Sequence, residues 1–114
     1  MIRLMKSPRS SANLKLPRRH LLLLRRVVGG SMSPRLTPGQ LLVASGWFKT
    51  IKPGDVCIFY QGGLEKVKRA ERVSKDKVFF IGDNLNFSSD SRHFGWIKKE
   101  SITAKVIWPK VHNN

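Results

Sequence analysis

Residues 56–73 read VCIFYQGGLEKVKRAERV, and this stretch decides the fold class. Residues 56–60 are β-branched, aromatic or otherwise apolar, and residues 65–73 intersperse Val67, Ala70 and Val73 among charged side chains. Gln61, Gly62 and Gly63 lie between the two runs, and glycine accepts the positive φ angles that a tight turn requires. The pattern predicts two antiparallel strands joined by a turn.

The same pattern continues on both sides of this hairpin. Further strands are predicted at residues 40–44, 78–81 and 102–108, and proline-glycine turns at residues 37–39 and 52–55. Residues 19–28 fit either a short helix or a strand, and residues 88–100 are the place for a turn or two of helix. We therefore expect a mainly β protein, a small antiparallel sheet or partly open barrel with little helix, in one domain over residues 19–114.

Basic residues dominate the composition. The 114 residues include 22 Lys and Arg against seven Asp and Glu, a formal charge of +15, and no acidic residue precedes Asp55. Residues 1–18 combine basic residues with serine and proline and lack apolar periodicity, so we expect a flexible basic arm. Such an arm suits a polyanionic partner, either nucleic acid or an anionic membrane surface.

Composition also disfavours several kinds of site. Cys57 is the single cysteine, so no internal disulfide can form, and no Cys/His cluster has the spacing of metal ligands. We expect neither a metal nor a cofactor. The apolar run at residues 21–24 is far shorter than the ~20 residues of a bilayer span, and shorter than the core of a secretory signal. The sequence therefore predicts no membrane anchor and a cytoplasmic or peripherally membrane-associated protein.

Residues 82–95, GDNLNFSSDSRHFG, concentrate side chains that form hydrogen bonds. By composition alone this is an Asx-rich surface loop. It also matches, at each fixed position, the pattern G-D-N-x-x-x-S-x-D-S-R-x-x-G of the type I signal peptidases. Residues 29–36, GGSMSPRL, resemble the nucleophile motif of that family, S-G-S-M-x-P-T-L, and residues 67–70, VKRA, resemble its lysine strand. The three segments follow the family order and cover roughly residues 29–107.

A serine nucleophile needs a base, because a hydroxyl reacts poorly until its proton is taken. The three histidines lie near the basic N-terminus (His20), at a variable position of the loop motif (His93) and at the C-terminal end (His112). A Ser-His-Asp triad is therefore disfavoured. A lysine can act as base if burial lowers its pKa from ~10.4 toward neutrality. The resemblance implies that Ser31 is the nucleophile and Lys68 its general base.

The resemblance also assigns supporting roles to the loop. Ser88 is expected to hydrogen-bond the Lys68 amine and orient it, although a turn-forming serine is the plain alternative. Asp90 and Arg92 are expected to form an ion pair that holds the loop over the sheet, where the alternative is two solvated charges.

The remaining assignments concern the two chain segments beside the nucleophile and the base. Asp83 and Asn84 are expected to brace the lysine strand through backbone hydrogen bonds. Met32 is expected to pack beside the nucleophile, and Pro34 to fix the direction of the chain that leaves it.

The sequence departs from the family at three places. Gly29 stands where many members have a serine that helps to form the oxyanion hole, so backbone N–H groups near Gly30 and Ser31 are expected to meet the developing charge. Losing one such donor can slow turnover by about 10²–10³. Arg35 replaces the threonine of the P-T-L segment, and the large inserted domain of longer bacterial members is missing between Lys68 and Gly82.

These observations favour a serine endopeptidase of the signal peptidase type. Its partner would be a precursor protein with an N-terminal leader or signal peptide, cleaved after small residues. A soluble maturation peptidase for a nickel superoxide dismutase precursor has a similar short architecture and stays open. An alternative of another class is a non-catalytic basic module that binds anionic lipid or nucleic acid, and nucleic acid is disfavoured by the peptidase motifs. The related self-cleaving repressor proteins, which share the Ser/Lys dyad, are disfavoured because the loop motif belongs to the signal peptidase branch.

Overall fold

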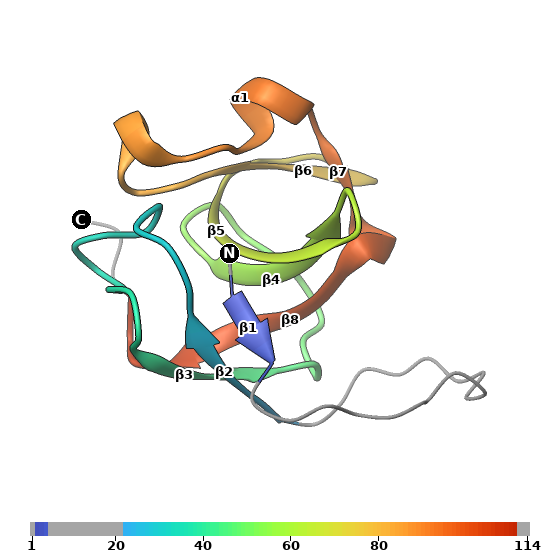
Figure 1. Cartoon of the computed structure of the whole chain (residues 1–114). Helices are drawn as coiled ribbons and strands as arrows, with labels where there is room; N and C mark the ends of the chain where they lie inside the picture. Colours follow the sequence, from blue (N-terminus) through green and yellow to red (C-terminus); the bar gives the residue numbers. More distant parts are fainter. Residues whose placement is uncertain (1, 5–21, 112–114) are drawn as a thin grey trace.

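The computed structural model describes residues 2–4 and 22–111 (Figure 1). Its elements in chain order are β1 (Ile2–Leu4), β2 (Leu23–Val27), β3 (Leu41–Ser45), β4 (Val56–Gln61), β5 (Leu64–Val73), β6 (Lys77–Ile81), the 3-10 turn η2 (Leu85–Phe87), α1 (Ser91–Phe94), β7 (Ile97–Lys98), the 3-10 turn η3 (Lys99–Ser101) and β8 (Ile102–Trp108). The expected mainly β fold with little helix is confirmed. The five strands predicted from residue 40 onward agree with β3, β4, β5, β6 and β8 to within one residue at each end.

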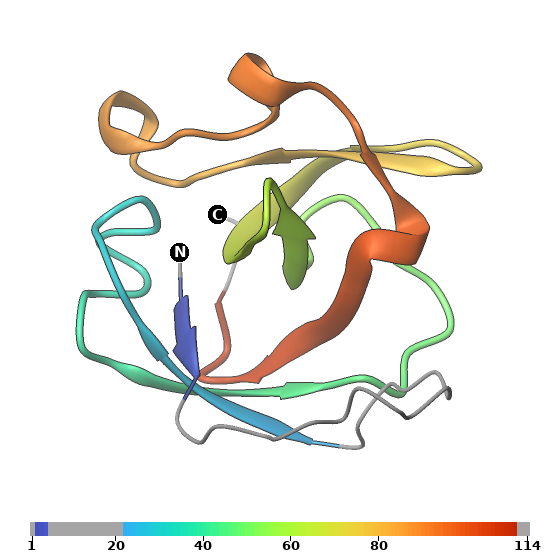
Figure 2. The same ribbon diagram turned by 45° about the vertical axis from the view of Figure 1, so that its right-hand side comes forward.

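The strands form one antiparallel sheet in the order β1-β2-β3-β8-β4-β5-β6-β7 (Figures 1 and 2). The last strand of the chain, β8, lies between β3 and β4 and pairs with both. Among the described residues β1 and β7 are the two edges and do not pair with each other, so the sheet curls but stays open.

Apolar side chains pack on both faces of β4, because successive residues of a strand point to opposite sides. Val56 and Ile58 belong to one core cluster with Leu42 and Val67, whereas Phe59 belongs to a second. In the second cluster Phe59 stacks on a partner ring of β6, Phe80, with centroids 4.2 Å apart. The hairpin of β4 and β5 is thus held from two sides, which gives β5 a rigid position.

Two short strands were not expected from the sequence. Ile2–Leu4, placed by the sequence within the basic arm, pair with β2, and the register sets Arg3 opposite Arg26. Residues 5–18 lie outside the described residues, so the extent of the arm and the domain boundary at residue 19 stay predictions. For residues 19–28 the structure selects the strand alternative over the helix at Leu23–Val27. The other unexpected strand, β7, is two residues long and pairs with β6.

Helices are short throughout the part of the chain that the structure describes. None of them has the length and apolar composition needed to cross a bilayer. The loop between β6 and β7, which carries η2 and α1, lies over the β5–β6 side of the sheet in both views (Figures 1 and 2). It faces the turn that follows β2, and the backbone N–H of Asn84 in the loop donates to the Ser31 carbonyl in that turn at 2.8 Å.

Candidate active site

The turn after β2 positions Ser31. Gly29 has a φ of +86°, a left-handed conformation that glycine adopts without strain, and it redirects the chain as β2 ends. Backbone hydrogen bonds from Ser33 N to Gly30 O (3.1 Å) and from Leu36 N to Met32 O (3.0 Å) then fix the turn. Ser31 is buried within it, at 8% exposure. The next side chain, Met32, is buried in the core.

Strand β5 positions Lys68 in the interior. The residue stands opposite Cys57 of β4 in the register and is only 3% exposed. Burial lowers the pKa of its amine from 10.5 to about 8, because the ammonium form loses hydration. The charge of Asp90 raises this pKa in part, and the positive charges of Lys66 and Arg92 lower it further. Lys68 therefore has a substantial neutral fraction near physiological pH.

A chain of hydrogen bonds orients the Lys68 amine. Nζ donates to Ser88 Oγ at 3.2 Å, and that hydroxyl donates in turn to Asp90 Oδ2 at 2.7 Å. The backbone N–H of Gly82 donates to the same carboxylate oxygen at 2.9 Å. Ser88 thus forms the expected hydrogen bond with the Lys68 amine and, in addition, links it to a fixed carboxylate.

Asp90 is held in its charged form. The carboxyl is fully buried, and burial by itself would raise its pKa, but hydrogen bonds from Arg92, Gly82 and Ser88 outweigh this and hold the pKa well below its usual range. Arg92 contributes a bidentate contact, Nε to Oδ1 at 2.8 Å and the second nitrogen to Oδ2 at 3.0 Å. Asp90 also caps α1 through the Arg92 backbone N–H. The expected ion pair is present, and it fixes the loop under which Lys68 lies.

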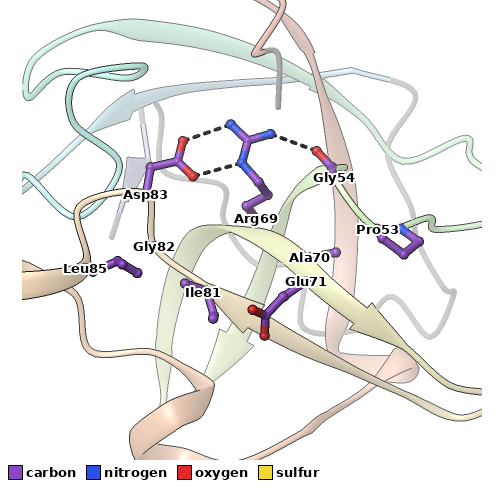
Figure 3. Close-up of a pocket in the computed structure, with 9 residues that line it drawn as sticks. All are labelled: Pro53, Gly54, Arg69, Ala70, Glu71, Ile81, Gly82, Asp83 and Leu85. Carbon is purple, nitrogen blue, oxygen red and sulfur yellow. Dashed lines mark hydrogen bonds and ion pairs between the residues drawn. The ribbon is translucent and has the colours of Figure 1, made fainter. Parts of the chain in front are cut away.

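Asp83 and Asn84 act differently from the expectation. The Asp83 carboxylate forms two 2.8 Å contacts with the Arg69 guanidinium, which also donates to the Gly54 carbonyl (Figure 3). This pair lies on the wall of a cavity of about 320 Å³, which is distinct from the cavity lined by Ser31 and Lys68 that is described below. Asp83 thus braces β5 with its side chain, through the residue after Lys68, and not through backbone bonds.

Asn84 braces the serine turn and not the lysine strand. Its backbone N–H donates to the Ser31 carbonyl, and its side-chain amide donates to the Gly30 carbonyl at 3.1 Å. The backbone N–H of Asp83 points to Met32 Sδ at 3.4 Å. The expectation was wrong for Asn84 because the loop after β6 folds toward the turn after β2, a proximity that local sequence does not encode.

One cavity of about 330 Å³ brings the nucleophile and base candidates together. It is lined by Val28, Gly29, Gly30, Ser31, Leu64, Lys66, Lys68, Phe87 and Ser89. Met32, Ser88, Asp90 and Arg92 support this lining without being part of it, as do Asp83 and Asn84. Pro34 is exposed and lies after a cis peptide bond in the turn, away from the lining.

The sequence reasoning missed part of the lining. Leu64 and Lys66 share a face of β5 with Lys68 because side chains alternate along a strand, and this alternation was a usable signal. Phe87 and Ser89 flank Ser88 in the loop, and nothing in their pattern predicted the side they occupy.

Gly82 is the first fixed position of the loop motif, and the sequence assigned it no role. A Cβ atom there would lie 2.7 Å from the Ser31 carbonyl oxygen and would collide with the Ser88 side chain. Only glycine lets the serine turn and the loop approach each other this closely. Gly82 therefore sets the spacing between the parts that carry Ser31 and Ser88.

Two other reactive side chains lie outside this arrangement. Cys57 is completely buried, and burial, with the charge of Asp55, raises the pKa of its thiol far above its usual range, so it is no nucleophile. His93 caps α1, accepting from the Asp90 backbone N–H at 3.4 Å, and does not line the cavity. Of the other two histidines, both His20 and His112 lie outside the described residues.

Comparison with known proteins relates the chain to one family. Residues 58–110 match the family described as signal peptidase, peptidase S26. Signal peptidase I of Bacillus caldolyticus is 45% identical over 49 residues, which cover 40% of this chain and 27% of that protein. Signal peptidase I V of Bacillus subtilis (strain 168) is 29% identical over 102 residues, which cover 76% of this chain and 56% of that protein. The chain therefore resembles the type I signal peptidases.

The matched region of this signal peptidase-like chain contains β5 with Lys68 and the whole loop from Gly82 to Gly95. Ser31 precedes it. The alignments span between about a quarter and just over half of the length of the two relatives.

Proposed function

We propose that this protein is a serine endopeptidase of the signal peptidase type, which removes an N-terminal leader or signal peptide with a Ser31/Lys68 dyad. The observation that carries the proposal is the buried lysine. Lys68 lines the same cavity as Ser31, and its pKa is lowered to about 8 by burial. An amine with that pKa is a competent base near neutral pH, which a solvated lysine is not.

In the proposed reaction the neutral Lys68 amine accepts the Ser31 proton as Oγ attacks the scissile carbonyl carbon. The tetrahedral intermediate collapses, and the Lys68 ammonium gives its proton to the departing amine, leaving an acyl-enzyme on Ser31. A water molecule then attacks the ester while Lys68 accepts a proton, and that proton returns to Ser31 Oγ when the acid is released. Ser88 keeps the Nζ lone pair directed by accepting a hydrogen bond from the amine.

Backbone groups of the serine turn are the proposed oxyanion donors. Gly29 has no side chain to contribute, so the N–H of Ser31 and its neighbours must meet the charge alone. Asn84 holds the serine turn by donating hydrogen bonds to the carbonyls of Gly30 and Ser31. These two bonds occupy carbonyl groups of the turn and none of its N–H groups, which suits the turn to the proposed role.

The proposed substrate is a precursor protein with an N-terminal leader. The two relatives are named as signal peptidases, which supports a signal peptide. A precursor of a nickel superoxide dismutase is the narrower alternative, and cleavage assays with both kinds of leader distinguish the two.

The decisive experiment compares Ser31→Ala with Ser33→Ala, a control in the same turn whose side chain does not line the cavity. A peptide library with small residues at a central position is incubated with each protein, and products are identified by mass spectrometry. We expect cleavage by the wild type and by Ser33→Ala, none by Ser31→Ala, and similar thermal melts for all three. Wild-type cleavage by a folded Ser31→Ala protein would refute the proposed nucleophile.

A further inference from the structure

A row of side chains from one face of β5 forms one wall of the cavity. Leu64, Lys66 and Lys68 follow one another at intervals of two residues and all line it. Residues two apart on a strand are separated by about 6.6 Å, and an extended peptide has the same repeat. A substrate that lies along β5 with its scissile bond at Lys68 therefore presents a side chain two residues away to Lys66.

Three carboxylates lie near this row of residues, one on β5 itself and two in the loop after β6. Each of them is already bound to an arginine. Each has a short ion pair among the described residues: Glu65 with Arg25 at 2.9 Å, Asp83 with Arg69 at 2.8 Å (Figure 3) and Asp90 with Arg92 at 2.8 Å. Asp90 is linked to Lys68 through the Ser88 hydroxyl, and none of the three carboxylates forms an ion pair with Lys66.

Lys66 has neutral partners. Its Nζ donates to Gln61 Oε1 at 2.8 Å and lies 4.4 Å from the centre of the Phe94 ring. Within residues 2–4 and 22–111, no carboxylate lies within ion-pair distance of this amine. A half-buried ammonium with only neutral partners attracts an anion more strongly than a fully solvated one.

The protonation state that the proposed reaction requires leaves the cavity with fewer positive charges. In the proposed reaction Lys68 must be neutral, and among the side chains that line the cavity Lys66 is then the remaining cation. No acidic side chain occurs in that lining. The cavity of the active form is therefore positively charged at one place, about two residues from the reacting bond.

We propose that Lys66 is a specificity residue that binds a carboxylate of the substrate. The inference rests on the proposed peptidase function and narrows its substrate class to peptides with Asp or Glu two residues from the scissile bond. Leu64, the next member of the row, then meets an apolar side chain two residues further along the same peptide.

The test uses a peptide that the wild type cleaves, remade with Glu or Gln two residues before the scissile bond, and with the same pair two residues after it. We expect the wild type to prefer Glu over Gln, on one of the two sides, by about fivefold or more in kcat/KM. The preference should shrink as salt is raised, because the cavity is open to solvent.

Variants connect this preference to Lys66. In Lys66→Met the Glu/Gln ratio should fall to about one, and in Lys66→Arg a preference for Glu should persist. Lys77→Met, which removes an exposed charge on β6 outside the cavity, is the matched control and should keep the wild-type ratio. A wild-type ratio near one at both positions, or a ratio that survives in Lys66→Met, would overturn the inference.

A binding measurement separates this inference from the proposed function. Fluorescently labelled Glu and Gln peptides are titrated into Ser31→Ala and into Ser31→Ala with Lys66→Met. A Glu preference that depends on Lys66 supports the specificity residue even if no cleavage is ever observed. Cleavage of Glu and Gln peptides at equal rates leaves the peptidase intact and refutes the role of Lys66.

Discussion

The pH dependence of the proposed reaction follows directly from the buried lysine. With a pKa of about 8, ~10% of the Lys68 amine is neutral at pH 7, against ~0.03% for an ordinary lysine. If the neutral amine is the base, kcat/KM should rise about tenfold between pH 7 and pH 9.5, with a midpoint near 8, and then level off. The measurement is initial rates on one peptide from pH 6 to pH 10.

Lys68→Arg tests the same point by substitution. A guanidinium stays protonated at every usable pH and cannot accept the Ser31 proton, so this variant should lose activity as completely as Lys68→Ala. Thermal melts provide the control for folding. A rate midpoint above pH 10, or near-normal activity in Lys68→Arg, would show that Lys68 is not the base.

The lowered pKa also predicts a stability effect of definite sign. Between about pH 8 and pH 10.5 the unfolded chain binds the Lys68 proton more tightly than the folded protein, so the free energy of unfolding should rise with pH in that window. Below pH 8 the folded protein carries the full cost of a buried ammonium, at most about 3 kcal/mol. Lys68→Met removes this cost.

Urea unfolding at pH 7, 9 and 10.5 measures the effect. We expect Lys68→Met to be more stable than the wild type at pH 7, by up to about 3 kcal/mol, and the difference to shrink toward pH 10.5. The gain is an upper limit, because the variant also loses the hydrogen bond to Ser88. If Lys68→Met is less stable than the wild type at pH 7, and the difference does not change with pH, burial does not disfavour the Lys68 ammonium.

Three further predictions concern the frame around the dyad and the arm. Gly82→Ala should cost about 1–3 kcal/mol of stability and most of the activity, because its Cβ displaces Ser88 and the serine turn; chemical unfolding and peptide cleavage check this. Asp90→Asn should cost about 2–4 kcal/mol at pH 7, a difference that begins to shrink as pH falls below ~4 and is lost only as pH falls through the lowered pKa of the folded Asp90. It should also move the rate midpoint to lower pH, because the Asp90 charge favours protonated Lys68. Replacing the four basic residues of positions 6, 9, 15 and 18 by serine, with β1 kept, should weaken binding to anionic vesicles by about 1 kcal/mol per residue at low salt, and unchanged vesicle binding would argue against an electrostatic arm.

Local sequence determined most of the secondary structure. The β-branched and aromatic run at residues 56–60 and the glycines at positions 62 and 63 indicated the β4–β5 hairpin, because β propensity and a turn's φ angles are properties of neighbouring residues. The resemblance of residues 29–36, 67–70 and 82–95 to one family's motifs predicted a Ser31/Lys68 dyad.

The sequence also identified the base candidate correctly as a buried strand residue, but it could not state what surrounds it. Ser31, Lys68 and Ser88 are brought to one place by the pairing of β5 with β4 and β6 and by the loop that returns to the turn after β2. These are long-range contacts, and their partners are selected by packing of the whole sheet.

Tertiary structure alone decided three further points. It assigned Asn84 to the serine turn, because the loop after β6 crosses to β2, and it made Gly82 the point of closest approach. It also left Lys66 with neutral partners while the neighbouring carboxylates bound arginines. Charge compensation depends on distances through space, and a sequence lists its charges without saying which pairs will meet.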